Sequence, residues 1–292
     1  MRSKDGQVAD WKDGSAYAPL READRSLFAW EWLRRDPDYR AAAGSIAGEC
    51  GLELVSDERA AKWGLHAFED PARGFGEARP VWRRGFYPLV LSAEAADDGA
   101  RDDRFDLTMF SDFTSLIKGP DGGEHVLVSD GRHMLRLDIL SGTLCSGPAR
   151  LHYRIAGMVE ALPPLLTLRR FLALWRTGDF SRSLHPPEAR AARWILLLRT
   201  YDGLAGGAGQ REIAEHLLDT DAAGARWRVA APALRSRVQR LVRDARRMAG
   251  GGYRELLAER GWAEQMLKDQ RDEPGPTSAN APSTGHPDHS PP

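Results

Sequence analysis

The sequence predicts an α+β protein in which helical regions lie on either side of a small antiparallel β region. Three observations lead to this fold class. Aromatic residues are dense between residues 10 and 43, apolar and polar residues alternate between about 81 and 155, and helical periodicity dominates from residue 156 onward. The expected regions are 8–75, 76–155 and 156–260, followed by a proline-rich tail at 268–292 that we expect to be disordered.

The N-terminal region is predicted to contain a short helix. Asp24 is a candidate N-cap, the helix would run to about Arg35, and Asp36-Pro37 would end it. Apolar residues lie all round this helix, which predicts packing on more than one side. The alternative interpretation is an exposed aromatic surface that docks a partner.

The central region is predicted to form strands. The clearest unit is a hairpin over His125–Leu140, in which Ser129-Asp130-Gly131 supplies the turn between two alternating runs. Gly119–Gly123 is typical of a second turn. Weaker strand candidates are Phe86–Ser92, Arg104–Phe110 and Ala149–Arg154.

The C-terminal region is predicted to be helical. Gly203–Gly209 would separate two helices, and Gly250-Gly251-Gly252 would stop the last one. The expected helices are Leu165–Arg176, Glu188–Tyr201, Gln210–Leu218 and Pro232–Ala249.

Most enzyme and membrane classes lack support in the sequence. The chain has no phosphate-binding P-loop, His-Glu-x-x-His, Cys-x-x-Cys or Gly-x-Ser-x-Gly. Apolar runs are too short to span a bilayer, the start does not read as a signal peptide, and the two cysteines form no disulfide framework. We therefore expect a reduced, cytoplasmic protein that is not an enzyme.

No metal or cofactor site is expected either. The aspartates between Asp97 and Asp106 match no calcium loop and are interpreted as a solvated loop. The histidines show no ligand spacing; those considered are His66, His125, His133, His152, His185 and His216.

One segment carries a strong positive charge. Residues 226–247 hold eight arginines and one acid, a net charge of +7, although the whole chain carries −1. The remainder therefore carries −8, and this asymmetry is typical of an electrostatic footprint for an acidic partner.

The same segment predicts a two-faced helix. At about 100° per residue, Leu234, Val238, Leu241, Val242, Ala245 and Met248 share one face. Arginine suits bidentate contacts to phosphate and guanine, and glutamine suits adenine. The residues expected to contact DNA are Arg226, Arg228, Arg235, Ser236, Arg237, Gln239, Arg240, Arg243, Arg246 and Arg247. The alternative is a solvated arginine face, but such a face usually mixes signs.

The residues before this helix favour a helix-turn-helix arrangement. In Gln210–Leu218, Ile213 and Leu217 would face the core, and Ala214 is small where a second helix could cross closely. One departure is the connector, Asp219–Ala230, because the motif normally uses three or four residues there.

Two parts of the chain resemble known bacterial families. The segment from about Ile155 to Leu257, including Gln210–Ala214, Leu234–Val238 and Gly251–Arg254, resembles the RovC-like DNA-binding domain of type VI secretion transcription activators. Asp10–Tyr17 and Phe28–Arg35 resemble a transcriptional-regulator-like domain that often precedes it. Related proteins are encoded on integrative and conjugative elements, where some activate excision genes. The resemblance assigns no individual contact residue.

Together these features predict a sequence-specific, DNA-binding transcription activator. Its expected partners are double-stranded DNA, further copies of itself in a homo-oligomer, and a regulatory protein bound through the N-terminal region. Two alternatives stay open. One is an interaction module whose arginine face binds an acidic protein, and the other is a metal-dependent nuclease that uses the Asp97–Asp106 cluster.

Overall fold

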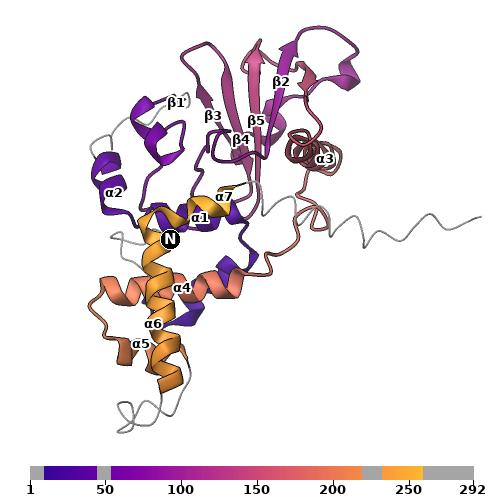
Figure 1. Ribbon diagram of the computed structural model, residues 1–292. Helices are drawn as coiled ribbons and strands as arrows, with labels where there is room; N and C mark the ends of the chain where they lie inside the picture. Colours follow the sequence, from indigo (N-terminus) through magenta and orange to yellow (C-terminus); the bar gives the residue numbers. More distant parts are fainter. Residues whose placement is uncertain (1–9, 45–53, 219–231, 259–292) are drawn as a thin grey trace, which may run out of the picture.

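The computed structural model describes residues 10–44, 54–218 and 232–258. A six-stranded sheet forms one end of the molecule, with helix α3 (Leu162–Thr177) packed beside it. Most of the remaining C-terminal helices gather at the other end, and the N-terminal helix α1 (Arg25–Leu33) lies between the two ends (Figure 1). In the described part of the chain, no helix combines the length and apolar character needed to cross a membrane.

The sheet is mixed, with the strand order β1-β3-β4-β5-β2-β6. Its strands are β1 (Leu54–Val55), β2 (Val90–Ala96), β3 (Thr114–Lys118), β4 (Glu124–Ser129), β5 (Met134–Ser141) and β6 (Arg150–Arg154). The β3-β4-β5 meander and the β2-β6 pair are antiparallel, as expected, but β2 pairs with β5 and β1 with β3 in parallel. The expectation of an antiparallel β region is therefore wrong only for these two pairings, because parallel partners are joined by long connections that leave no local turn signal.

The predicted hairpin is confirmed. The pairing of strands β4 and β5 ends with Ser129 opposite Met134, so residues 130–133 form the turn, which begins with the predicted Asp130-Gly131. Gly131 has a φ of +88°, and a Cβ atom there would lie 2.3 Å from the carbonyl oxygen of Gly76. The turn at Gly119–Gly123 is also confirmed, since the Gly119 N–H donates to the Gly123 carbonyl at 2.7 Å. Both turns thus follow from local glycine chemistry.

The weaker strand candidates had different outcomes. Ala149–Arg154 contains β6, whereas Phe86–Ser92 contains only the first residues of β2. The strand expected at Arg104–Phe110 was wrong, because residues Leu107–Phe113 form the 3₁₀ helix η4. Asp106 caps this helix by accepting a hydrogen bond from the Thr108 N–H at 2.9 Å, a local interaction that competes with strand pairing.

The N-terminal helix α1 is confirmed, and all of its residues are buried. Asp24 accepts a hydrogen bond from the Leu27 N–H at 2.9 Å, and Pro37 begins the next helix, α2 (Pro37–Gly44). The aromatic side chains Phe28, Trp30 and Trp32 are at most 1% exposed. These side chains belong to the hydrophobic core, so the alternative of an exposed aromatic docking surface is wrong for this helix. Two 3₁₀ helices flank these elements, η1 (Gly14–Glu22) and η2 (Glu58–Trp63), and a third, η3 (Arg101–Asp103), precedes η4.

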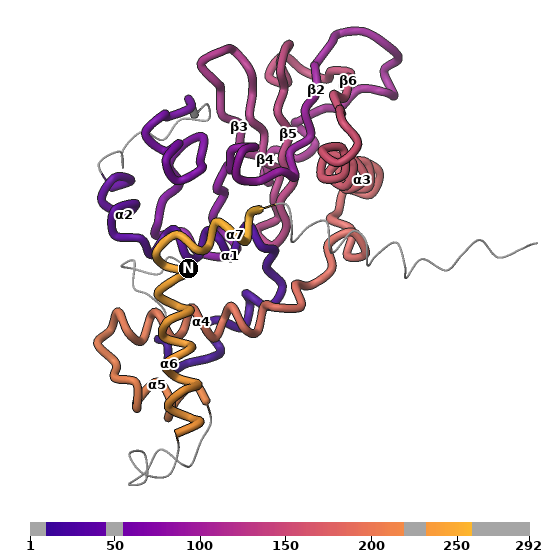
Figure 2. The backbone as a smooth tube through the Cα atoms, viewed as in Figure 1, coloured from indigo at the N-terminus to yellow at the C-terminus, as the bar shows by residue number. Residues whose placement is uncertain are grey.

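The C-terminal helices divide between the two ends of the molecule. Helix α3 packs on β2 and β5, whereas α4 (Ala191–Ala205), α5 (Gln210–Leu217) and α6 (Pro232–Arg247) pack on one another. A π-helical turn, η6 (Met248–Gly252), and a short helix, α7 (Arg254–Leu257), lead back to α1. Figure 2 shows the N-terminal segment running alongside α4, in agreement with the contacts of η1 with that helix.

The predicted glycine break is shorter than expected. Helix α4 continues through Ala205, so Gly203 lies inside it, and the break begins at Gly206. Gly203 allows a close approach there, since a Cβ atom would lie 3.0 Å from the ring of Trp11. The predicted stop after α6 is confirmed, since Gly251 has a φ of +105°. The expected tail at 268–292 lies outside the described residues.

The N-terminal region and the C-terminal helices share one hydrophobic core. The ring of Phe28 packs edge-on against Trp194 with centroids 4.9 Å apart, and Trp32 packs against Tyr201 at 5.7 Å. Arg35 donates two hydrogen bonds to the buried carboxylate of Asp202, at 2.7 and 2.9 Å. These contacts fix α4, the helix on which α6 rests, against α1.

Candidate nucleic-acid interface

Helix α6 is held by an apolar stripe on one of its faces. Val238, Leu241, Val242 and Ala245 are buried, and Met248 extends the stripe into η6. The stripe packs against α4 and α5, and Figure 1 shows α6 crossing in front of α4 with α5 beside its lower part. Pro232 starts the helix, at a position where its missing N–H costs nothing. The two-faced geometry expected from the sequence is therefore present.

The opposite face of α6 is exposed and basic. Arg235 is half-buried, and the other predicted contact residues on the helix are exposed: Ser236, Arg237, Gln239, Arg240, Arg243, Arg246 and Arg247. We call these eight residues the α6 basic face. Arg226 and Arg228 were predicted to belong to the same interface, but they lie outside the described residues.

Few of these arginines are neutralised within the protein. Arg247 forms an ion pair with Glu255 at 2.9 Å, and Arg243 lies 4.0 Å from Asp244. Among residues 10–44, 54–218 and 232–258, no acidic side chain forms an ion pair with Arg235, Arg237, Arg240 or Arg246. A face that was merely solvated would gain from nearby acids, so this distribution favours an acidic partner.

Asp244, the single acid of residues 226–247, forms an ion pair with a residue of another helix. Its carboxylate lies 2.7 Å from the guanidinium of Arg193 on α4, which is itself half exposed. Arg193 was missed at the sequence level, because its position beside α6 depends on how α4 and α6 cross. The pair neutralises Asp244 and places a further arginine at the border of the α6 basic face.

Helix α5 packs against α6 as the first helix of the predicted pair. Ile213 and Ala214 are buried, and Leu217 is partly buried against the same core. The N-terminal segment reaches this helix. Lys12 forms an ion pair with Glu212 at 2.8 Å, and the ring of Trp11 packs edge-on against that of His216 with centroids 5.4 Å apart. The hydrogen bond from Lys12 lowers the pKa of Glu212 below its ordinary value. The connector between α5 and α6 lies outside the described residues.

The acidic cluster does not converge on a cation site. Asp97 pairs with Arg104 at 2.6 Å, Asp103 with Arg150 at 3.2 Å, and Asp98 with His152 at 3.3 Å. Asp106 serves as the cap of η4. Within the described residues no three of these carboxylates come together as metal ligands. The nuclease alternative therefore gains no support from their arrangement.

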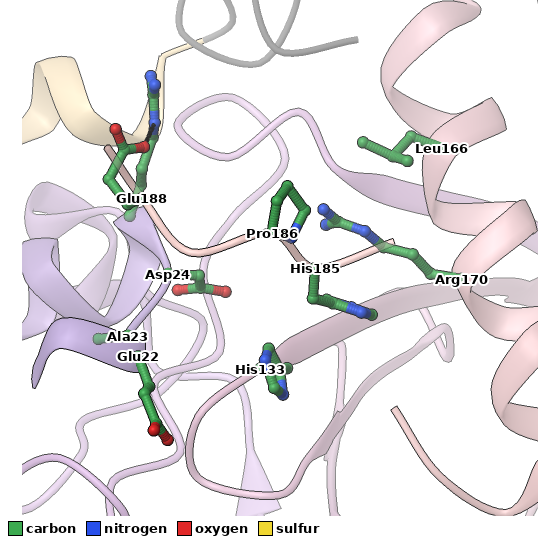
Figure 3. A pocket seen from close by; sticks show the side chains of 10 residues that line it. Glu22, Ala23, Asp24, His133, Leu166, Arg170, His185, Pro186 and Glu188 are labelled. Atoms are coloured by element: carbon green, nitrogen blue, oxygen red, sulfur yellow. Dashed lines mark hydrogen bonds and ion pairs between the residues drawn. The ribbon is translucent and has the colours of Figure 1, made fainter. Parts of the chain in front are cut away.

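A small cavity lies where α1, the β4-β5 turn, α3 and the segment before α4 meet. Its volume is about 40 Å³, and Figure 3 shows Asp24, His133 and His185 around it, with Arg170 reaching in from α3. Burial raises the pKa of Asp24 and lowers that of His185 to about 3. This space has room for a few water molecules.

Comparison with known proteins finds two segments of the chain that match models of domain families. Residues 157–258 match the family model of the T6SS (type VI secretion system) transcription factor DNA-binding domain. Residues 10–66 match the proteobacterial transcriptional regulator-like domain. No curated protein is similar enough to the chain to count as a match.

The resemblance stated from the sequence is thus confirmed for both regions and in the expected order. Both matched families are DNA-binding or regulatory rather than enzymatic. The α6 basic face lies inside the DNA-binding match, and the helix α1 that supports α4 lies inside the regulator-like match.

Proposed function

We propose that this transcription regulator, whose partner is DNA, is a sequence-specific activator that binds the double helix through the α6 basic face. The observation that carries the proposal is the set of unpaired arginines opposite the buried stripe of a helix inside the DNA-binding match. Its target genes would be those of type VI secretion or of mobile-element excision. It acts in the cytoplasm and is not an enzyme.

The residues of this face divide by chemistry. Arginines near its edges position the helix by contacting phosphates, which carry no sequence information. Arginines near its centre, together with Gln239, are suited to guanine and adenine edges in the major groove. Arg226 and Arg228 belong to the same proposed interface, as do Arg235, Ser236, Arg237, Arg240, Arg243, Arg246 and Arg247.

A homo-oligomer completes the proposal, because one 16-residue helix reads only a short site. The outer side of α3 supports it with apolar side chains that are exposed in the single chain: Leu162, Leu165, Leu172 and Trp175. The regulator-like N-terminal region would contact a regulatory protein.

The proposal is tested by measuring DNA affinity and its dependence on salt. Genomic fragments captured by the purified full chain supply the site, and affinity is measured on that site and on a scrambled duplex. We expect Arg240→Gln combined with Arg243→Gln to weaken binding and to reduce the slope of log affinity against log salt by about two. An arginine that reads a base would instead cost about 1–3 kcal/mol on the specific site alone.

A matched control removes the same charge elsewhere. Arg101 and Arg182 are exposed and lie outside α4–α7, so Arg101→Gln with Arg182→Gln should leave affinity and slope unchanged. Equal losses of DNA affinity in both double variants would show that the effect arises from net charge alone. Unchanged DNA binding in a folded Arg240/Arg243 variant would overturn the proposal, and retention of an acidic protein in place of DNA would favour the interaction module.

A further inference from the structure

Three side chains that carry possible metal-ligating atoms converge between the N-terminal region and the sheet. His66 follows η2, His125 lies on β4, and Asp138 lies opposite His125 on β5. One ligand atom from each lies within 4.8 Å of the others. The Nδ1 atom of His125 is 2.8 Å from Oδ1 of Asp138, and the ring of His66 stacks on that of His125 with centroids 3.5 Å apart.

His66 is unsatisfied in this arrangement. Its side chain is buried, with 7% of the residue exposed, and neither Nδ1 nor Nε2 has a hydrogen-bond partner. Burying such a polar group without a partner is unfavourable. Neither ring nitrogen is engaged by another group of the protein, so a lone pair of this ring can be directed at an ion.

We propose that His66, His125 and Asp138 bind a divalent first-row transition metal, with zinc as the best fit. Two imidazoles and one carboxylate are a donor set that zinc accepts, leaving a fourth position for water. Binding would give the buried His66 nitrogen the partner that it lacks, and His125 would bind the ion through a ring nitrogen of its neutral form. The site is independent of the DNA interface, which lies on α6.

Arg136 sets the character of the site. Its Nη2 atom donates to Oδ1 of Asp138 at 2.9 Å, and its other nitrogens donate to the carbonyl oxygens of Trp82, Val126 and Leu137. These bonds hold the carboxylate in position, as partners of metal ligands commonly do. The positive charge of the Arg136 guanidinium also repels a bound metal ion and so weakens its binding. The site is therefore suited to reversible binding rather than to a permanently held structural ion.

The position of the site gives the metal a structural consequence. His66 is the last residue of the regulator-like match, whereas His125 and Asp138 belong to the sheet outside both matches. A bound ion would cross-link these two parts.

The test uses the full chain, stripped with a chelator and titrated with Zn²⁺ and with Co²⁺ as a spectroscopic probe. We expect one ion per chain, visible-region Co²⁺ absorption that Zn²⁺ displaces, and a higher melting temperature with Zn²⁺. His66→Gln and Asp138→Asn should each weaken binding at least about 10-fold. Circular dichroism checks that each variant is folded.

Matched controls separate this site from other histidines. His152 also pairs with a carboxylate, Asp98, but is exposed, so His152→Gln should bind normally. His286→Gln with His289→Gln tests the tail in the same way. Absence of saturable binding by the unmodified chain would overturn the proposal without any variant. It would also be overturned if the tail variant lost the ion or if a folded His66→Gln protein kept it.

Discussion

At the scale of single residues, Asp202 connects helix α4 to the N-terminal region. Its buried carboxylate accepts hydrogen bonds from the Tyr17 hydroxyl at 2.6 Å and from two nitrogens of Arg35. The partners are more than 160 positions away in the sequence, so no spacing rule could have identified them. The sequence did identify Asp24 as a cap, because capping depends on residues only three positions apart.

Replacing Asp202 with alanine should destabilise the protein by about 3 kcal/mol, because a buried guanidinium then loses its bidentate partner. Glu31 lies 2.6 Å from Arg35 and keeps part of the compensation. The free energy of unfolding in urea measures the effect. Tyr17→Phe removes one hydrogen bond and should cost about 1 kcal/mol. If the two variants were equally stable, the ion pair would not contribute as described.

At the scale of elements, α6 was the most predictable helix and its surroundings were the least. Its apolar stripe repeats within one local segment, so the sequence alone defined which face is buried. The pairing of Asp244 with Arg193 could not be predicted in this way, because it depends on the crossing of α4 and α6. The same holds for His66, His125 and Asp138, whose sequence spacing shows no ligand pattern. The strand expected at Arg104–Phe110 failed for the opposite reason, since one capping aspartate outweighed the alternation of apolar residues.

The two faces of α6 should respond oppositely to substitution. Leu241 is 1% exposed, and Leu241→Asp buries a charge in the stripe, so we expect the helical end to unfold. Arg240→Gln with Arg243→Gln alters only exposed positions and should change the free energy of unfolding by less than about 0.5 kcal/mol each. Thermal unfolding followed by circular dichroism distinguishes the two. A large loss of stability in the arginine variant would mean that its DNA defect reports folding.

At the scale of the whole molecule, the order of regions could be predicted from the sequence, but their packing could not. Composition and periodicity separate residues 8–75, 76–155 and 156–260, and these boundaries remain a proposal. In the structure, α3 packs on the sheet whereas α4 and α6 belong to the core that contains α1. Contacts between segments that are far apart in the sequence decide this arrangement. Local sequence patterns do not indicate which of these segments will pack together.

The shared core leads to a prediction about fragments. A chain that begins near Ala156 would expose Trp194 and Tyr201, which pack on Phe28 and Trp32, and would leave Asp202 without Arg35. We expect this fragment to melt well below the full chain, or to be expanded in gel filtration, because those buried contacts are lost. Adding a fragment of residues 10–66 should restore part of its stability if α1 alone supplies the missing surface. A C-terminal fragment with the melting temperature of the full chain would show instead that its amphipathic helices bury one another, and that the contacts with α1 contribute little.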